Sequence, residues 1–225
     1  MKKLTLSFMA LAMAAAVVSC KKSETDSTVT KEQQEVAAQS GAQYQADSAT
    51  SVVKWNATHK GGMAPRYGTL SLQNGTVSVE NGAVTGGEFT IDLNSLKVDP
   101  ASVTEADKKP EDLAGHLKSA DFFDVEKYPT AKFEITSVAP FDAAKDQSKL
   151  EGATNIVSGN LTLKDKTINV TFPAKITVTD AALELAANFT VDRSAWNLTY
   201  GAEGDPKDWA ISKDIDIALD LKAKK

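Results

Sequence analysis

The chain of 225 residues contains a single cysteine, at position 20, and only two histidines, His59 and His116. A lone cysteine excludes intramolecular disulfides, and with two distant histidines it also excludes the common cysteine-rich zinc and iron–sulfur arrangements. Lysine and arginine form no block longer than a pair, and the net charge is −5. The basic surface that nucleic-acid binding requires is therefore missing. We expect one ordinary domain, stabilised by burial of apolar side chains.

The short motifs of common enzyme classes are also missing. The sequence has no nucleophile elbow, phosphate-binding loop, paired catalytic carboxylates or zinc-protease helix. His59 and His116 lie far apart, without a neighbouring cluster of cysteines or carboxylates. We therefore interpret them as structural, hydrogen-bonded residues rather than general bases or metal ligands, and predict no catalytic residue, no metal and no required cofactor.

The first residues have the features of a secretion signal. Lys2 and Lys3 precede an uncharged run that ends at Val17-Val18-Ser19-Cys20. This run is too short to span a membrane comfortably. Its end resembles the lipobox of bacterial lipoproteins, which implies a signal peptide over residues 1–19 and a Cys20 that carries acyl chains such as palmitate.

Residues 20–43 are polar and lack aromatic side chains. Such a composition buries too little apolar surface to order itself, so we predict a flexible tether ahead of a domain over residues 44–225. No aspartate directly follows Cys20, which resembles lipoproteins sorted to an outer membrane. We expect a lipid-anchored protein of the bacterial cell envelope, in the outer membrane and facing the periplasm or the cell surface.

From Tyr44 onward, apolar and polar residues alternate with a period of two, which is typical of antiparallel strands with one buried face. A short helix is predicted at Glu111–Ser119, and a short extra strand near residues 76–80. The long strands are predicted at about residues 50–60, 66–72, 84–94, 130–138, 155–163, 167–178, 183–192 and 210–222.

Turn residues separate several of these segments. Asn74-Gly75 and Asn81-Gly82 are typical of tight hairpins, because both central residues of a type I′ turn need positive φ. Lys164-Asp165-Lys166 indicates another short connection. Pro173 interrupts a strand pattern, so that strand is an edge, is bulged, or lacks a partner at this point.

Eight antiparallel strands either close into a barrel or split into a sandwich. The pattern alone leaves both open. A barrel of this size is either filled by side chains or wide enough for one small ligand. Its inward faces would be aliphatic and phenylalanine, so a cavity would accept a hydrocarbon chain and reject an ionic substrate.

Several segments together resemble the bacterial YceI-like family of lipocalin-like, polyisoprenoid-binding proteins. The densest match runs from Gly115-His116-Leu117-Lys118-Ser119 through Asp121-Phe122-Phe123-Asp124 to Tyr128-Pro129. Further matches are Val53-Lys54-Trp55 with His59, Gly86–Leu96, Gly159–Leu163 and Phe189–Ser194. The resemblance implies an all-β, closed eight-stranded antiparallel barrel with a long apolar channel and no required enzymatic activity. One departure is Asn197 after Trp196, where the family pattern has glycine; asparagine tolerates the left-handed backbone that a turn there needs.

We expect the short helix to cover one end of this barrel, anchored by His116, with Phe122 and Phe123 plugging that end or lining its mouth. We expect Asp192 and Arg193 to form a local salt bridge. Alternatively, Arg193 contacts a ligand head group together with His59. The predicted lining residues are Trp55, Phe89, Ile91, Phe133, Ile135, Leu161, Leu163, Phe172, Leu185 and Phe189.

The sequence thus predicts non-enzymatic binding, sequestration or transport of an isoprenoid lipid, polyprenyl or quinone-type, or of a fatty amphiphile. One alternative is a filled barrel that acts as an envelope stress or interaction module. Another is an enzyme acting on such a lipid, which would need polar groups converging inside the barrel. The expected partners are this lipid and, through the acyl chains, a membrane. The oligomeric state stays open, a homodimer included.

Overall fold

The structure, a computed structural model, describes residues 25–59, 64–202 and 211–225. The predicted signal peptide and Cys20 lie outside this range. Within it, none of the helices has the length and apolar character needed to cross a membrane.

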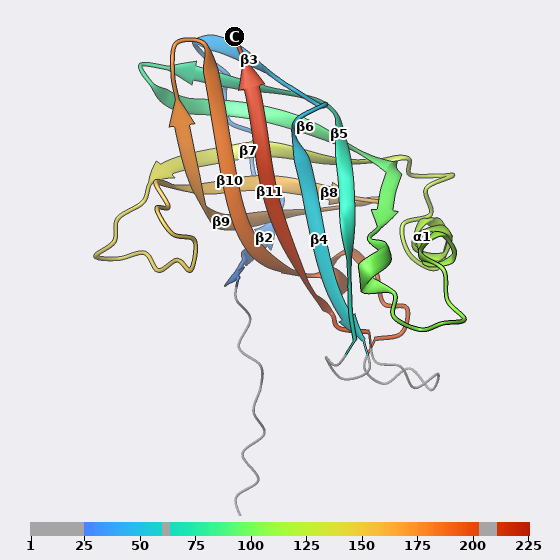
Figure 1. The fold of residues 1–225 in the computed structure, drawn as a ribbon. Helices are drawn as coiled ribbons and strands as arrows, with labels where there is room; N and C mark the ends of the chain where they lie inside the picture. The colour runs from blue at the N-terminus through green and yellow to red at the C-terminus, as the bar shows by residue number, and fades with distance from the viewer. Residues whose placement is uncertain (1–24, 60–63, 203–210) are drawn as a thin grey trace, which may run out of the picture.

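Eight strands form a closed antiparallel barrel (Figure 1). Each strand pairs with the next along the chain, and the last pairs back to the first, with Leu219 opposite Val53. The predicted barrel is therefore confirmed and the sandwich excluded. The strands are β4 (Val52–His59), β5 (Ala64–Glu80), β6 (Ala83–Val98), β7 (Thr130–Pro140), β8 (Asn155–Leu163), β9 (Lys166–Val178), β10 (Ala182–Asp192) and β11 (Asp214–Lys224).

One of the two predicted asparagine–glycine turns is present and the other is wrong. Asn81 and Gly82 both have positive φ, 53° and 79°, and join β5 to β6. Asn74 and Gly75 instead lie inside β5, which continues from Ala64 to Glu80 with an irregular register between Leu72 and Asn74. Gly75 is needed for another reason: a Cβ there would lie 2.4 Å from the ring of Phe89. The glycine makes room for an inward aromatic ring rather than for a turn.

Pro173 lies at a point where one side of β9 has no strand partner among the described residues. Strand β10 pairs with β9 from Lys175 onward, and β2 (Val29–Glu32) pairs with it only up to Thr171. On the other side, the amide of Thr154 donates to the carbonyl of Ala174, so the Ala174 backbone faces β8 and the Pro173 nitrogen faces away from it. The missing N–H therefore costs no ladder hydrogen bond.

The N-terminal segment, residues 25–46, lies along the outside of the barrel, and we call it the strap. It contains β1 (Asp26–Ser27), β2 and β3 (Ala42–Ala46). Strand β1 pairs with β10 and β2 with β9, while β3 pairs with both β11 and β5. In Figure 1 the strap is the blue chain that leads from β2 at the bottom to β3 at the top.

Hydrogen bonds hold the strap between its strands. The backbone N–H and carbonyl of Gln34 bond to the side chain of Asn160, at 3.0 and 2.7 Å, and the amide of Ala37 donates to the carbonyl of Ile135 at 3.0 Å. The structure thus differs from the predicted flexible tether over residues 25–43. The polar composition correctly indicates that the segment buries little apolar surface, but backbone pairing with barrel strands orders it.

Helix α1 (Pro110–Lys118) lies beside one end of the barrel, as predicted (Figure 1). Its first turn contains Pro110 at the position that tolerates proline, together with Glu111 and Asp112, which favour a helix N-terminus. A short 3-10 helix, η1 (Pro100–Ser102), follows β6, and another, η2 (Arg193–Trp196), follows β10. Asn197 ends η2 with φ 60° and ψ 21°, so this asparagine adopts the left-handed conformation expected at that turn.

Candidate functional site

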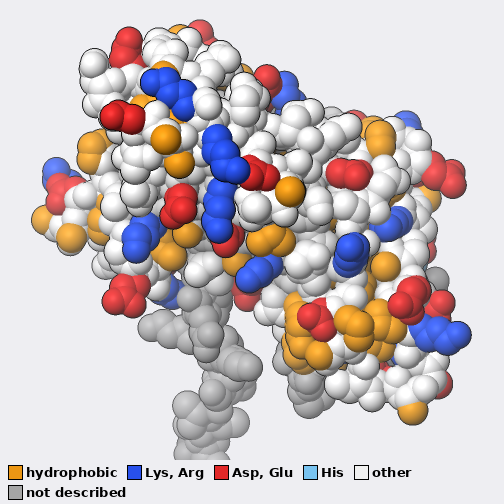
Figure 2. Space-filling model, turned by 45° about the horizontal axis from the view of Figure 1, so that its top comes forward, with side chains coloured by type: hydrophobic (Ala, Val, Ile, Leu, Met, Phe, Trp, Pro, Cys, Tyr) orange, Lys and Arg blue, Asp and Glu red, His pale blue; other side chains and the backbone are white. Residues whose placement is uncertain are grey.

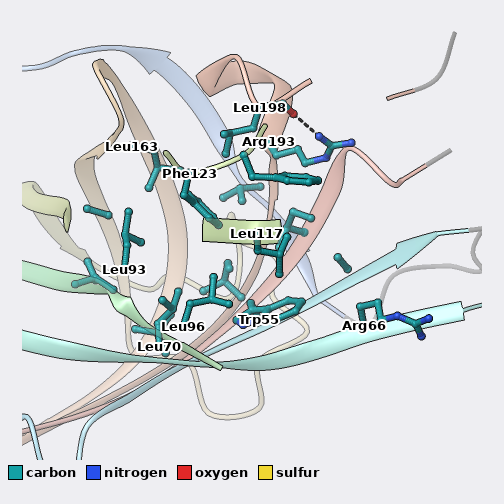
Figure 3. Close-up of a pocket in the computed structure, with 18 of the residues that line it drawn as sticks. Trp55, Arg66, Leu70, Leu93, Leu96, Leu117, Phe123, Leu163, Arg193 and Leu198 are labelled. Atoms are coloured by element: carbon teal, nitrogen blue, oxygen red, sulfur yellow. Dashed lines mark hydrogen bonds between the residues drawn. The ribbon is translucent and has the colours of Figure 1, made fainter. Parts of the chain in front are cut away.

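The barrel encloses a cavity of about 740 Å³. Nearly all of its wall is apolar, contributed by the inward-facing side chains of all eight strands and by Leu117 and Phe123 beside the barrel end (Figure 3). Strand β4 shows how the sequence builds this wall: Val53, Trp55 and Ala57 face the cavity, one residue in two. The volume falls within the range of pockets that bury a small organic ligand.

All ten residues predicted to line a cavity lie on its wall, and so do His59 and Arg193. Sequence reasoning missed other wall residues that the same alternation could have indicated, such as Leu70 and Leu72. It also missed Leu96, Leu117 and Leu198, which lie outside the regular inward pattern and reach the cavity through the packing of the barrel end (Figure 3).

Three aromatic rings follow one another across the inner wall of β7, β9 and β10. The ring centroids of Phe133 and Phe172 are 5.9 Å apart, and Phe172 stacks on Phe189 at 4.1 Å with an interplanar angle of 14°. Gly159 on β8 gives Phe133 its space, because a Cβ there would lie 2.2 Å from the Phe133 ring. This row offers flat apolar surfaces against which an unsaturated chain or ring can pack.

The two ends of the barrel differ in polarity. At the end where β9 turns into β10, Tyr44 is buried and its hydroxyl donates to the carbonyl of Thr179 at 2.8 Å; Val79 and Leu183 are buried in the same core. Polar and charged residues of the cavity lining gather at the opposite end, which we call the mouth: Thr58, His59, Arg66, Glu105, Lys108, Lys109, Asp112, His116 and Arg193.

Helix α1 and the aromatic pair after it pack at the mouth. His116 bonds to Asp121 at 3.0 Å, and its ring makes edge contacts with Phe122 and Tyr200 at centroid distances of 5.2 and 5.0 Å. Both Phe122 and Phe123 contribute to the cavity wall. His116 therefore joins the helix to the following segment and to the residues after η2.

Arg193 is held by the protein itself. Its guanidinium donates to the backbone carbonyls of Ser212, Leu198 and Ile211, the second of which is drawn in Figure 3. Burial lowers the pKa of Arg193 from its ordinary value, partly offset by Asp192, and the group remains a cation at neutral pH. These bonds tie η2 to the segment before β11.

The salt bridge predicted between Asp192 and Arg193 is replaced by other contacts. The Asp192 carboxylate accepts from the backbone N–H of Ser194 at 2.9 Å and from its hydroxyl at 2.6 Å, and lies 3.6 Å from Lys213. An aspartate at this position caps η2, because it accepts from one of the free N–H groups of the first turn.

Sequence reasoning did not identify an ion pair at the mouth between Arg66 and Glu105. Both carboxylate oxygens of Glu105 lie 2.7 Å from the same guanidinium nitrogen, and Arg66 also donates to the carbonyl of Ser102. The side chains are 12% and 27% exposed. Thirty-nine positions separate the two residues, so no local pattern links them. The pair fixes the segment after η1 against β5.

No metal site is evident in the part of the chain that the structure describes, and the face drawn in Figure 2 carries no large patch of one charge. Those residues include no group of three or more histidine, cysteine, aspartate or glutamate side chains that could hold a metal ion. Figure 2 shows Lys, Arg, Asp and Glu side chains scattered over one face of the molecule rather than gathered by sign. The exposed large hydrophobic side chains among these residues are Val29 and Val36, both in the strap.

The profile of the YceI-like domain family matches residues 44–223. This range covers the barrel strands and leaves out most of the strap. The chain belongs to the YceI-like family. Curated relatives include a UPF0312 protein of Pseudomonas aeruginosa (strain LESB58) and protein YceI of Salmonella arizonae, each 36% identical over 94 residues. Each alignment spans 40% of this chain and 44% of the relative, so the chain matches less than half the length of these curated relatives.

Solved structures share the YceI-like fold. The crystal structure of BcnA from Burkholderia cenocepacia has a TM-score of 0.56 and 24% identity, over 79% of this chain and 99% of BcnA. A domain from Saccharophagus degradans, described as polyisoprenoid-binding, has a TM-score of 0.51 and 15% identity, over 84% of this chain and 99% of that domain. At these identities the likeness concerns the fold.

Proposed function

We propose that this YceI-like protein binds an isoprenoid lipid, polyprenyl or quinone-type, or a fatty amphiphile, and sequesters or transports it without catalysing a reaction. The observation that carries the proposal is the apolar cavity of about 740 Å³ inside the barrel. Burial of apolar surface contributes about 25 cal/mol per Å², so a long hydrocarbon chain offers enough to exceed the cost of association. The polyisoprenoid-binding description of the Saccharophagus degradans domain supports the isoprenoid class.

The geometry supports the two alternatives less well. A barrel that acts only as an interaction module needs no internal space, and this one leaves a ligand-sized cavity. An enzyme needs polar groups that converge on a substrate. Here the charged lining residues lie at the mouth, where Arg66 pairs with Glu105 and Arg193 donates to three backbone carbonyls.

We further propose that Cys20 carries acyl chains that anchor the protein in a bacterial membrane. The residues that follow the cysteine favour the outer membrane, because no aspartate directly follows Cys20. The strap changes what such an anchor would do. Because the chain is already paired to the barrel at Asp26, only five residues, 21–25, separate Cys20 from the paired chain, and five residues span at most about 18 Å. The barrel would then stay close to the bilayer, where lipid exchange with the membrane is short-range.

Organic extraction of the purified protein, followed by mass spectrometry, tests the binding proposal. The protein should be produced in bacteria from residue 21 onward, so that the strap is included and the acyl chains are not. We expect a stoichiometric isoprenoid or fatty lipid in the extract. If no lipid co-purifies and added polyprenols, quinones and fatty amides are not taken up, the proposal is wrong.

A matched pair of variants locates the binding site. Ala57 faces the cavity on β4, whereas Ala218 on the neighbouring strand β11 lies between the inward residues Ile217 and Leu219 and faces outward. Ala57→Leu should reduce the amount of bound lipid or shift it to shorter chains, and Ala218→Leu should leave both unchanged. Equal lipid loss in the two variants would contradict binding inside the barrel.

Lipid labelling in a bacterial host tests the anchor separately. The full-length protein should incorporate labelled palmitate and fractionate with the outer membrane, and Cys20→Ser should abolish the labelling. Labelling that persists in the Cys20→Ser variant would refute the assignment of Cys20.

A further inference from the structure

The strap begins on the outside of the barrel, close to its mouth. The Thr25 hydroxyl donates to the Asp216 carboxylate at 2.8 Å, and the Thr190 hydroxyl donates to the same oxygen at 2.7 Å. Strand β11 begins at Asp214, and β10 ends at Asp192. Both residues that hold Thr25 therefore lie two positions from the mouth end of their strands.

A groove on the barrel surface places Thr25 in the same region by a separate route. Its lining includes Thr25, Asn56 and Pro65. Asn56 lies three residues before the end of β4, and Pro65 is the second residue of β5. The end of β4 and the start of β5 belong to the mouth, where Thr58, His59 and Arg66 line the cavity. Two pairs of strands thus agree that the strap starts beside the mouth.

Hydrogen bonds fix the first residues of the strap to the barrel. The Asp26 carboxylate accepts from the hydroxyl of Ser148 at 2.7 Å and from the backbone N–H of Lys149 at 2.9 Å. Asp26 also pairs with Phe189 on β10. These contacts prevent the strap from adding to the reach of the chain before it. We call residues 21–25 the leash, and its full extension is about 18 Å.

The leash can reach past the mouth but not past the opposite end of the barrel. Along β10, the mouth end is two residues from Thr190, or about 7 Å. In the other direction, β10 continues for eight residues to Ala182, which is about 26 Å along the strand. Because barrel strands tilt by about 40°, this distance is about 20 Å along the barrel axis. Even a fully extended leash is shorter than that.

The sides of the barrel offer a bilayer little apolar surface. The exposed large hydrophobic side chains among the described residues are Val29 and Val36, and single exposed valines are ordinary on a soluble surface. The mouth, in contrast, leads into a cavity with a nearly wholly apolar wall. Contact with hydrocarbon is therefore favourable at the mouth rather than along a side.

We propose that the anchored protein holds its mouth against the bilayer and keeps its opposite end away from it. This inference rests on the proposed acylation of Cys20 and deepens the proposed lipid binding. The partner of the mouth is the lipid surface itself. A lipid then passes between the bilayer and the cavity without exposing its hydrocarbon chain to water, which otherwise opposes its transfer.

Two matched fluorescent labels test the orientation. Asp107 is exposed between η1 and α1, close to the mouth residues Glu105 and Lys108, and Asp180 is exposed between β9 and β10. Asp107→Cys and Asp180→Cys would each be labelled in the acylated full-length protein, in which lipid blocks the Cys20 thiol. The vesicles would contain phosphatidylethanolamine, phosphatidylglycerol and a lipid with a spin-labelled head group as quencher. We expect loss of fluorescence at position 107 and not at position 180.

Equal loss at the two positions, as in a barrel lying on its side, would overturn the inference. A larger loss at position 180 would overturn it as well. Both positions lie outside the cavity lining, so lipid extraction from the same variants reports binding independently of orientation.

A longer leash tests the cause of the orientation. An insert of about twenty glycine and serine residues after Lys22 gives the leash an r.m.s. reach of about 25–30 Å, which exceeds the distance to the opposite end. We expect the difference between the two labels to shrink or disappear. A difference that persists would refute the leash as the cause.

Sedimentation with the vesicles separates this inference from the proposal on which it rests. Protein that stays in the supernatant would refute the acylated anchor, and the orientation with it. Protein that sediments but shows equal fluorescence loss at both labels would refute the orientation alone.

Discussion

The junctions between neighbouring barrel strands are of two kinds. Five are paired over eight to eleven residue pairs: β4–β5, β5–β6, β7–β8, β8–β9 and β10–β11. Three are shorter: β9–β10 has four pairs, and β6–β7 and β11–β4 have five each. The strap meets all three of the short junctions. Strands β1 and β2 pair where β9 and β10 part, Ala37 bonds to β7 beside β6, and β3 pairs with β11 beyond the end of β4.

The difference shows why a polar segment is ordered here. Where two strands diverge, their backbone N–H and carbonyl groups lack partners, and a passing chain can supply them whatever its side chains are. Asn160 and Asn169 on the outer face are almost fully buried and bond to each other at 3.1 Å. Asn160 in turn holds Gln34. The long junctions depend on side-chain alternation, whereas the short ones depend on the strap.

Removal of residues 25–40 should destabilise the barrel more than any of the other changes considered below, because the strap supports the short junctions. The deletion leaves Tyr44 and β3 in place but takes the partners from the β9–β10 and β6–β7 junctions. We expect the melting temperature to fall by about 10 °C, which for a domain of this size corresponds to about 3 kcal/mol. Circular dichroism against the protein from residue 21 onward measures the change. A difference under about 2 °C would mean that the barrel closes without the strap.

Asn160→Ala should destabilise the protein less than the deletion does, through lost contacts between β8 and the strap. The substitution removes both hydrogen bonds to Gln34 and the acceptor of Asn169, so we expect a loss of about 1–3 kcal/mol in the free energy of unfolding. Hydrogen exchange should become faster at the Gln34 amide. Ser158→Ala is the control on the same face of β8, since the Ser158 hydroxyl bonds to Thr171 on the neighbouring barrel strand. Faster strap exchange in both variants would contradict the assigned role of Asn160.

Asp192→Ala should have the smallest effect, at the mouth end of β10. Burial raises the pKa of Asp192, but the Ser194 hydroxyl and N–H and then Lys213 outweigh it, so the folded pKa lies below its ordinary value of 3.8. The ionised cap therefore stabilises the fold above that value, and its contribution is lost as the pH falls through the folded pKa. We expect a loss of about 1 kcal/mol at pH 7. Urea unfolding at pH 7 and near pH 3 should show the gap between variant and parent narrowing; a constant gap would exclude the ionised cap.

Much of the barrel could be predicted because the pattern that specifies each strand lies within that strand's own sequence. Inward residues such as Phe172 and Leu185 follow a period of two, and a buried face enforces that period wherever the strand lies. Asn74-Gly75 was misread because the local sequence cannot distinguish a turn from a glycine that yields space to Phe89. The ion pair of Arg66 and Glu105 was equally out of reach, since only the folded chain brings the two together.

The sequence by itself determined the strands, the apolar character of the cavity wall and the membership in the YceI-like family, because alternation and family motifs are written along the chain. The tertiary structure decided where the strap lies, that it begins beside the mouth and that Arg193 binds backbone carbonyls. Each of these depends on which backbone and side-chain groups remain unpaired once the barrel has closed. Hydrogen-bond partners are a property of the whole fold, whereas burial periodicity is a property of each strand.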